Sequence, residues 1–579
     1  MAATAWTVFQ GRRPEPMQVE ILGVLHNARG PGQDLILARL HGAKPEYTGV
    51  VAGMSGSPVY IDDKLLGALS YRIGQFTKEP IAGITPIAQM LAVRRFSGQR
   101  DGSAPLRVPV SAVAALALAT VNQDSTAEAA TAFAPTFEPT FEPMETPLVE
   151  SGLAPEALRF WRQQMASTPL AAIAAGGSSA GTDANDAASP GARRAAAALQ
   201  PGSSVSMQLV RGDIEVAATC TITWIDPKQL LACGHPVLGA GPVSLPMTTA
   251  EVVATVASPL NAFKIVNTGP VIGAFDEDRA SAIHGLFGAR ASMIPVRVAV
   301  DAPGGSRVIN AEILDLPSLT TVALQTVLLD ALVQSNAGSE ALSDHLTGSV
   351  DLAGEPAMPL DVWASAETAL PASLQTALLA GQQFAALYTN QARQGLVRRV
   401  DLRVQAVPRS VQVTLTQARI LSGDTAHAGD AIAIEATLQP WQQPERTLRI
   451  SFRLPARLAT GNLQLLVSGG ATLDRLLHPP KPGAPQPDLA TLLAEASTRH
   501  AADHLYVSLL APDAQGEVDG RTLVSLPLSM ANAIEPLRST QEVHLNSESA
   551  QPLADLPAGG LLNGFQRLDL HIEPGGGVN

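Results

Sequence analysis

Two short stretches of the sequence place residues that could carry out acyl transfer where glycine and proline control the backbone. The first, GMSGSP, presents Ser55 between Gly53 and Gly56 and is followed by Pro58. Peptide hydrolysis by a serine requires a nucleophile, a base that takes its proton, and N–H donors for the oxyanion. Glycine at position 53 leaves room for a carbonyl oxygen, so we expect the N–H groups of Gly53 and Ser55 to form an oxyanion hole. The alternative interpretation is a glycine–serine turn between two strands.

Two features beside Ser55 narrow the interpretation of the first stretch. Ser57 is predicted to be a hydrogen-bonding residue of the loop and not the attacking group. The residues after it, VYIDDKLLGAL, predict a strand, an Asp-Asp turn and a second strand. The nucleophile turn of α/β-hydrolases needs a helix at this position, so the sequence argues against that fold.

The second stretch, ACGHPVLG, holds a candidate general base, His235, between Gly234 and Pro236. Histidine exchanges protons near neutral pH, which suits this role, although a surface loop histidine is the other interpretation. His500 and His504 lie four residues apart in a segment predicted to be helical, without the glutamate of a zinc-protease motif. We therefore expect a solvated helix face there, and predict no metal site and no cofactor.

Length, charge and cysteine content narrow the class of protein. A chain of 579 residues is too long for one core and predicts about three to four domains. The net charge of −13, without a basic stripe, argues against nucleic-acid binding. Cys220 and Cys233 flank a predicted turn, and a disulfide or two reduced core thiols both fit.

Targeting signals are not evident in this chain. No run approaches the roughly 20 apolar residues of a membrane span, so no transmembrane segment is predicted. The first residues, MAATAWTVFQG, lack the basic flank and apolar centre of a signal peptide. Export or a place in the cell envelope would require an upstream signal that has been removed, so the localisation is left open.

Alternation of polar and apolar residues predicts a mainly β, multidomain protein. The predicted segments are a serine-bearing β-barrel half (1–98), an Ala/Pro/Gly/Ser-rich connector with one helix (99–203), a histidine-bearing β-barrel half (204–315), a helical and mixed connector (316–399), an immunoglobulin-like β-sandwich (400–472) and a mixed α/β tail with a disordered end (473–579).

Longer segments around the two stretches resemble one known family. GVVAGMSGSPVYIDDKLLGALSY resembles the nucleophile segment of the SpoIVB-type serine peptidases, the stage IV sporulation protein B family. VAATCTITWIDPKQLLACGHPVLGAG resembles the histidine segment of the same family. The resemblance implies a chymotrypsin-like double β-barrel core assembled from the two separated halves. It also implies a serine endopeptidase that acts on protein or peptide substrates, with Ser55 as the nucleophile and His235 as the general base.

Three features depart from the family pattern. The histidine half follows the serine half, 235 − 55 = 180 residues later, instead of preceding it. No counterpart of the family's PDZ module is found. His41 stands where the catalytic aspartate is expected, which leaves a Ser–His dyad or a relocated acid, for which the candidates are Asp34, Glu46, Asp226, Asp276 and Asp278. A catalytically inactive binding or scaffold protein is the alternative function.

Overall fold

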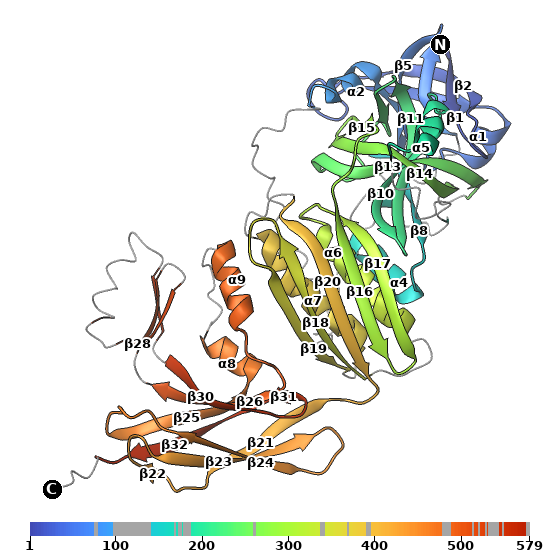
Figure 1. The fold of residues 1–579 in the computed structure, drawn as a ribbon. Helices are drawn as coiled ribbons and strands as arrows, with labels where there is room; N and C mark the ends of the chain where they lie inside the picture. Colours follow the sequence, from blue (N-terminus) through green and yellow to red (C-terminus); the bar gives the residue numbers. More distant parts are fainter. Residues whose placement is uncertain are drawn as a thin grey trace, which may run out of the picture. The chain divides into compact units, whose positions relative to one another are not determined.

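The computed structural model describes residues 1–73, 79–96, 141–166, 170–171, 177, 187–258, 262–335, 342–366, 370–389, 395–477, 488–511, 514–518, 521–526, 530, 543–546 and 549–574 (Figure 1). The chain divides into two compact units. The first comprises Met1–Val298, Val308–Gln334 and Gln391–Asp401, and the second comprises Ala299–Arg307, Ser335–Asn390 and Leu402–Asn579. The predicted mainly β, multidomain class is confirmed. No helix in the described ranges is both long and apolar enough to cross a membrane.

The N-terminal strands of the first unit close into a six-stranded barrel. Its strands are β1 (Ala2–Thr7), β2 (Glu15–Leu25), β3 (Leu35–His41), β4 (Pro58–Ile61), β5 (Lys64–Ile73) and β6 (Ile81–Pro86). They pair in the order β1-β2-β3-β6-β5-β4, and β4 closes the barrel by pairing with β1 as well. Alternate residues such as Ala38, Leu40 and Ile84 point into its core. The predicted Asp-Asp turn joins β4 to β5, and both aspartates have positive φ.

A second six-stranded barrel follows in the same unit. Its strands are β10 (Ser204–Gly212), β11 (Glu215–Ile225), β12 (Gln229–Ala232), β13 (Gly241–Val256), β14 (Phe263–Arg279) and β15 (Ala282–Phe287). They pair in the order β10-β11-β12-β15-β14-β13, and β13 closes the barrel on β10. Counted along the chain, both barrels have the strand order 1-2-3-6-5-4. Figure 1 shows the blue strands of the first barrel beside the green strands of the second.

The segment between the barrels contributes strands to both of them. β7 (Phe141–Pro143) pairs with β5, β8 (Thr146–Ser151) pairs with β11, and β9 (Leu170–Ala171) pairs with β8. These additions place the apolar side chains of Met144, Leu148 and Val149 in the interior. The predicted helix is present as α4 (Pro155–Met165), and α5 (Pro190–Ala197) is a second helix, capped by the Ser189 side chain. The expectations for residues 97–140 lie outside the described residues.

Three further helices complete the described part of the first unit, and three further strands are each divided between the two units. α1 (Ala43–Thr48) and α2 (Ile87–Val93) flank the strands of the first barrel. β16 (Met293–Ala302) is followed by β17 (Gly305–Leu314), which pairs with β10. α6 (Thr320–Ser335) follows and is largely buried, and β20 (Val397–Val407) comes later in the chain.

The second unit contains a hairpin with a helix on it, and a β-sandwich. The hairpin is formed by β18 (Ser343–Leu352) and β19 (Met358–Ser365), with α7 (Ala372–Thr389) beside it. One sheet of the sandwich comprises β21 (Gln412–Ile420), β23 (Ala431–Pro440), β24 (Arg446–Arg453) and β31 (Leu561–Asn563). The other comprises β22 (Thr425–Ala426), β25 (Gly461–Gly469), β26 (His504–Ala511), β30 (Ser549–Pro557) and β32 (Phe565–Ile572).

The sandwich extends beyond the range 400–472 because its second sheet needs later strands to cover the core. Leu465 of β25 packs in one cluster with Val507 of β26 and Leu570 of β32. α8 (Gly470–Leu477), α9 (Leu489–Thr498) and the three-stranded sheet of β27 (Ala514–Val518), β28 (Arg521–Leu526) and β29 (Val543–Asn546) complete the unit. The expected helix face with His500 and His504 is wrong, because α9 ends at Thr498 and His504 begins β26.

Candidate active site

The two loops that carry the candidate catalytic residues occupy the same position in their barrels. Ser55 lies between β3 and β4, and His235 lies between β12 and β13, so each follows the third strand of its barrel. The loops pack backbone to backbone at Gly56, which has a φ of +95°. A Cβ atom there would lie 1.9 Å from the carbonyl oxygen of Thr221 and 2.6 Å from the nitrogen of Cys233, two residues before His235. The structure therefore brings the two predicted segments together.

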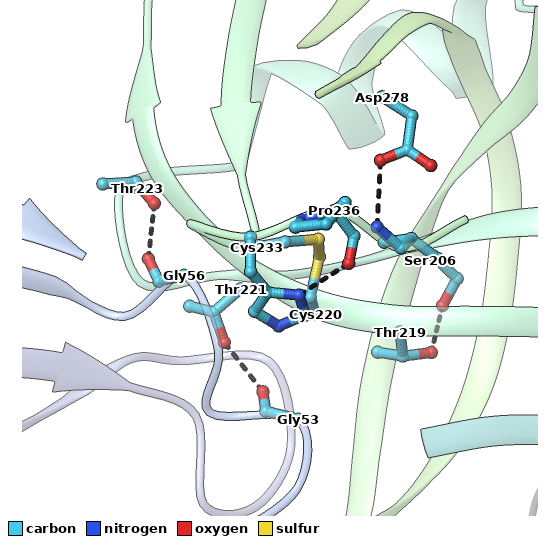
Figure 2. Close-up of a disulfide and its surroundings, with 12 residues drawn as sticks. Gly53, Gly56, Ser206, Thr219, Cys220, Thr221, Thr223, Cys233, Pro236 and Asp278 are labelled. Carbon is cyan, nitrogen blue, oxygen red and sulfur yellow. Dashed lines mark hydrogen bonds between the residues drawn. A yellow bond between two sulfur atoms is a disulfide. The ribbon is translucent and has the colours of Figure 1, made fainter. Parts of the chain in front are cut away.

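Strand β11 of the second barrel holds the serine loop through three hydrogen bonds, and Figure 2 shows the two that the side chains of Thr221 and Thr223 donate. The hydroxyl of Thr221 donates to the carbonyl of Gly53 at 3.0 Å, and its N–H donates to the carbonyl of Ser55 at 2.8 Å. The hydroxyl of Thr223 donates to the carbonyl of Gly56 at 2.7 Å. Both threonines serve one loop because alternate residues of a strand point to the same face.

The backbone around Ser55 leaves two N–H groups available. The carbonyl of Ala52 accepts from a β14 backbone N–H at 3.2 Å, and the carbonyl of Met54 accepts from the N–H of Ser57 at 2.9 Å. Because C=O and N–H point in opposite directions across a trans peptide, the N–H groups of Gly53 and Ser55 point away from these partners. Among the described residues, neither N–H has a hydrogen-bond acceptor. This arrangement is compatible with the predicted oxyanion hole.

Ser57 has the structural role expected from the sequence. Its hydroxyl donates to the carbonyl of Met54 at 2.6 Å, so it braces the turn from within.

The proposed nucleophile and base are both fully buried. The exposed fractions of Ser55 and His235 are 0%, and within the described part of the chain neither Ser55 Oγ nor His235 Nε2 has a hydrogen-bond partner. A hydrogen bond between these two atoms is therefore not formed in this structure. Buried polar atoms without partners are uncommon, because each costs about 1–3 kcal/mol relative to a paired one. Thirteen such side-chain atoms occur among the described residues, and these two are placed on adjoining loops, which makes this region a functional candidate.

The ring of His235 is oriented by the main chain. Its Nδ1 lies 2.7 Å from the carbonyl oxygen of Pro236. Because a carbonyl oxygen can only accept, the proton resides on Nδ1 and the lone pair on Nε2, which is the tautomer that a general base requires. Burial lowers the pKa of His235 to about 4, with a smaller lowering by the charge of Arg29, while the Pro236 hydrogen bond acts in the opposite direction. The ring is therefore neutral at pH 7.

None of the five candidate acids is hydrogen-bonded to His235 in the described structure. Their partners are His26 for Asp34, His41 for Glu46, Gln229 for Asp226, His284 for Asp276 and the loop 237–239 for Asp278. His41 itself lies 3.3 Å from a carboxylate oxygen of Glu20. A directly paired Asp–His–Ser triad is therefore absent from the described residues, and the sequence motif alone did not reveal what replaces the acid.

The structure also places a buried lysine, Lys264, against the serine loop. Lys264 Nζ donates to the carbonyl of Gly53 at 3.0 Å and to the hydroxyl of Thr7 at 2.9 Å. Burial lowers its pKa to about 7. The surrounding sequence, NAFKIVN, is that of a strand, and a single lysine in such a strand carries no signal that distinguishes it from a solvent-exposed residue.

Cys220 and Cys233 form a disulfide, which decides between the two alternatives left open by the sequence (Figure 2). Both residues are buried. The bond links β11, which carries the threonines that hold the serine loop, to the residue directly after β12. It therefore ties the start of the histidine loop to the strand that anchors the serine loop.

The segment between the barrels covers part of the serine loop. Pro147 Cγ would lie 3.1 Å from a Cβ atom at Gly53. Pro147 belongs to β8, which pairs with a strand of the second barrel, and β7, which precedes it in the chain, pairs with a strand of the first barrel. Ser55 has no exposed surface, so a molecule from solvent can reach it only if residues around it move.

The described residues contain no group of three or more His, Cys, Asp or Glu side chains placed to hold a metal ion. Comparison with known proteins adds no relative to this picture: no family model, no curated protein and no solved structure matches the chain.

Proposed function

We propose that the protein is a serine endopeptidase of the SpoIVB type, which cleaves protein or peptide substrates through an acyl-enzyme. The observation that supports this most strongly is the packing of the Ser55 loop against the His235 loop, although the two residues are 180 positions apart. A glycine–serine turn without a chemical role would not require a histidine loop in backbone contact, nor two unpaired polar atoms there.

In the proposed reaction, the groups of the two loops act one after another. Ser55 Oγ attacks the substrate carbonyl carbon while His235 Nε2 takes the hydroxyl proton. The N–H groups of Gly53 and Ser55 bind the resulting oxyanion. The C–N bond then breaks, and His235 returns its proton to the leaving amine. Water, deprotonated by the same nitrogen, hydrolyses the ester and regenerates the Ser55 hydroxyl.

Burial of the site gives the reaction a structural prerequisite. Ser55 and His235 must move into hydrogen-bond distance, about 2.6–3.2 Å, when substrate binds, since catalytic hydrogen bonds often tighten only in the complex. Exclusion of water strengthens the oxyanion contacts once the site is assembled. We propose that the structure represents the closed form of the site.

The proposal also includes a fold assignment for each of the two units. Two six-stranded barrels with equal strand order, each offering the connection after its third strand, support a chymotrypsin-like core. The four-stranded and five-stranded sheets of the second unit, which share one apolar core, support an immunoglobulin-like sandwich with a binding role.

Labelling with a fluorophosphonate probe, located by mass spectrometry, tests the function. The wild type should be labelled on Ser55, and Ser55→Ala and His235→Gln should abolish labelling. Ser204→Ala is the matched control, because Ser204 Oγ is also buried without a partner in the described structure but lies on β10, outside a glycine loop. Absence of wild-type labelling, or equal labelling of Ser55→Ala, overturns the proposal and favours the inactive binding or scaffold protein.

A further inference from the structure

The carboxylate of Asp278 holds the loop that follows His235. Its Oδ1 accepts from the N–H of Val237 at 2.9 Å, and its Oδ2 accepts from the N–H groups of Leu238 at 2.6 Å and Gly239 at 3.0 Å. Its exposed fraction is 1%. Figure 2 shows the carboxylate facing this loop.

The geometry indicates that Asp278 is ionised. N–H donors approach both oxygens, and each of these contacts is stronger when the acceptor is an ionised carboxylate. Burial raises the pKa of Asp278 above its ordinary value, and the backbone N–H groups act in the opposite direction by stabilising the anion. The ionised form fits the geometry because three donors converge on the two oxygens and none of the contacts requires Asp278 to donate.

One peptide unit connects this carboxylate to the imidazole. The N–H that donates to Asp278 Oδ1 belongs to the peptide bond between Pro236 and Val237, and the carbonyl of that same bond accepts from His235 Nδ1. The N–H and C=O of a trans peptide point in opposite directions. Fixing the N–H at Asp278 therefore directs the carbonyl toward the imidazole.

We propose that Asp278 is the relocated acid of this site and acts as a positioning residue, through the Pro236–Val237 peptide unit, on the ring of His235. The inference rests on the proposed function and deepens it. Consecutive hydrogen bonds polarise each other, so the carboxylate makes the Pro236 carbonyl a better acceptor. The carbonyl fixes the proton on Nδ1, leaves Nε2 free for the Ser55 proton, and stabilises the imidazolium that forms.

The position of Asp278 on the sheet makes this relay rigid. Asp278 pairs with Gly241 of β13 on one side and with Ile283 of β15 on the other. Because both neighbours belong to the closed barrel, the carboxylate is held independently of the loop that it orders. A positioning residue requires such an anchor, since a mobile carboxylate would follow the loop instead of setting its conformation.

Asp278→Asn is the central test. The amide retains the size of the side chain but replaces one acceptor oxygen by an NH₂ group that faces N–H donors. Imidazole ¹⁵N chemical shifts of histidine-labelled protein, assigned with His235→Gln, report the tautomer directly. We expect the Nδ1–H tautomer in the wild type, a mixed tautomer in Asp278→Asn, and a fall of about 10- to 100-fold in the rate of fluorophosphonate labelling.

Two further variants separate positioning from folding. Asp330→Asn is the matched control, because Asp330 is a buried carboxylate on α6 that accepts from the N–H of Ala154, and it should leave the His235 tautomer and the labelling rate unchanged. Asp278→Glu retains the carboxylate, so its His235 should keep the Nδ1–H tautomer of the wild type. This variant carries the test if Asp278→Asn proves unstable.

The outcomes distinguish this inference from the proposed function. An unchanged tautomer in Asp278→Asn, whether or not labelling falls, overturns the positioning role and leaves Asp278 as a support of the loop. A mixed tautomer with slower labelling supports the inference. If Asp278→Asn shows a mixed tautomer but the wild type is never labelled, Asp278 positions the ring through the peptide unit and the peptidase proposal is wrong. The two results are separable because the NMR measurement does not depend on activity.

Discussion

Replacing Gly56 with alanine should separate the two loops of the candidate site. The left-handed backbone at φ +95° costs a non-glycine residue about 1–2 kcal/mol. The added Cβ would overlap the carbonyl oxygen of Thr221 at 1.9 Å, so β11 and the loop must part by more than 1 Å, which is about the shortfall from a normal contact. That movement breaks the hydrogen bonds from Thr221 to Ser55 and from Thr223 to Gly56. With about 1–1.5 kcal/mol for each of the two bonds, added to the backbone cost, the total loss is about 3–5 kcal/mol.

Gly11→Ala is the control that measures the cost of the left-handed backbone alone. Gly11 also has a positive φ, +73°, but a Cβ there would meet no atom within 4 Å, so only about 1–2 kcal/mol should be lost. Urea unfolding followed by tryptophan fluorescence measures both variants, in a background where Trp363 and Trp441 of the second unit are phenylalanine. If the two variants lose the same free energy within about 0.5 kcal/mol, the loops are not interlocked and the reasoning is refuted.

Three further perturbations test the groups around the site. Lys264→Met should flatten the pH dependence of stability above about pH 7: burial lowers the folded-state pKa from 10.5 to about 7, so the unfolded chain binds more protons between these values and wild-type stability should rise with pH there. Urea unfolding of the wild type and the variant across this pH range measures how the unfolding free energy changes with pH. Parallel changes in the two proteins contradict the lowered pKa of Lys264. His235→Gln should flatten the pH dependence of stability at lower pH, between about 4 and 6.5. The folded pKa is lowered from 6.5 to about 4, so the wild type should lose stability as the pH falls through that window, and an equal loss in the variant refutes the buried neutral ring. Replacing Cys220 and Cys233 together by alanine opens a loop with a sequence separation of 13 and should lower the unfolding free energy by about 3 kcal/mol. A change below about 1 kcal/mol in urea unfolding argues against the disulfide as a constraint.

The local features of the site could be predicted because they follow from residue type. Glycine at positions 53 and 56 permits the positive φ values that the structure shows, and the Asp-Asp turn follows from the flanking strand pattern. The role of Ser57 was predicted for the same reason, since a hydroxyl beside a turn commonly bonds the backbone. These inferences need only neighbours in sequence.

The long-range features could not be predicted, because main-chain atoms supply many of the partners. The carbonyl of Pro236 orients the imidazole, and the carbonyls of Gly53 and Gly56 accept from the threonines of β11. Every residue has a carbonyl, so the sequence carries no mark of which one is used. Asp278 was one acid among five, and only its contact with the Val237 N–H distinguishes it.

If the chain is of the proposed SpoIVB type, the exchanged order of its serine and histidine halves is understandable from the barrels themselves. Both have the strand order 1-2-3-6-5-4, and each presents the connection after its third strand. Exchanging which barrel comes first alters neither connection; it alters only the segment that joins the barrels. In this chain that segment enters both sheets and places Pro147 against Gly53. Under the proposed function, the consequence of the exchange should therefore be found in access to Ser55 and not in the arrangement of the proposed catalytic groups.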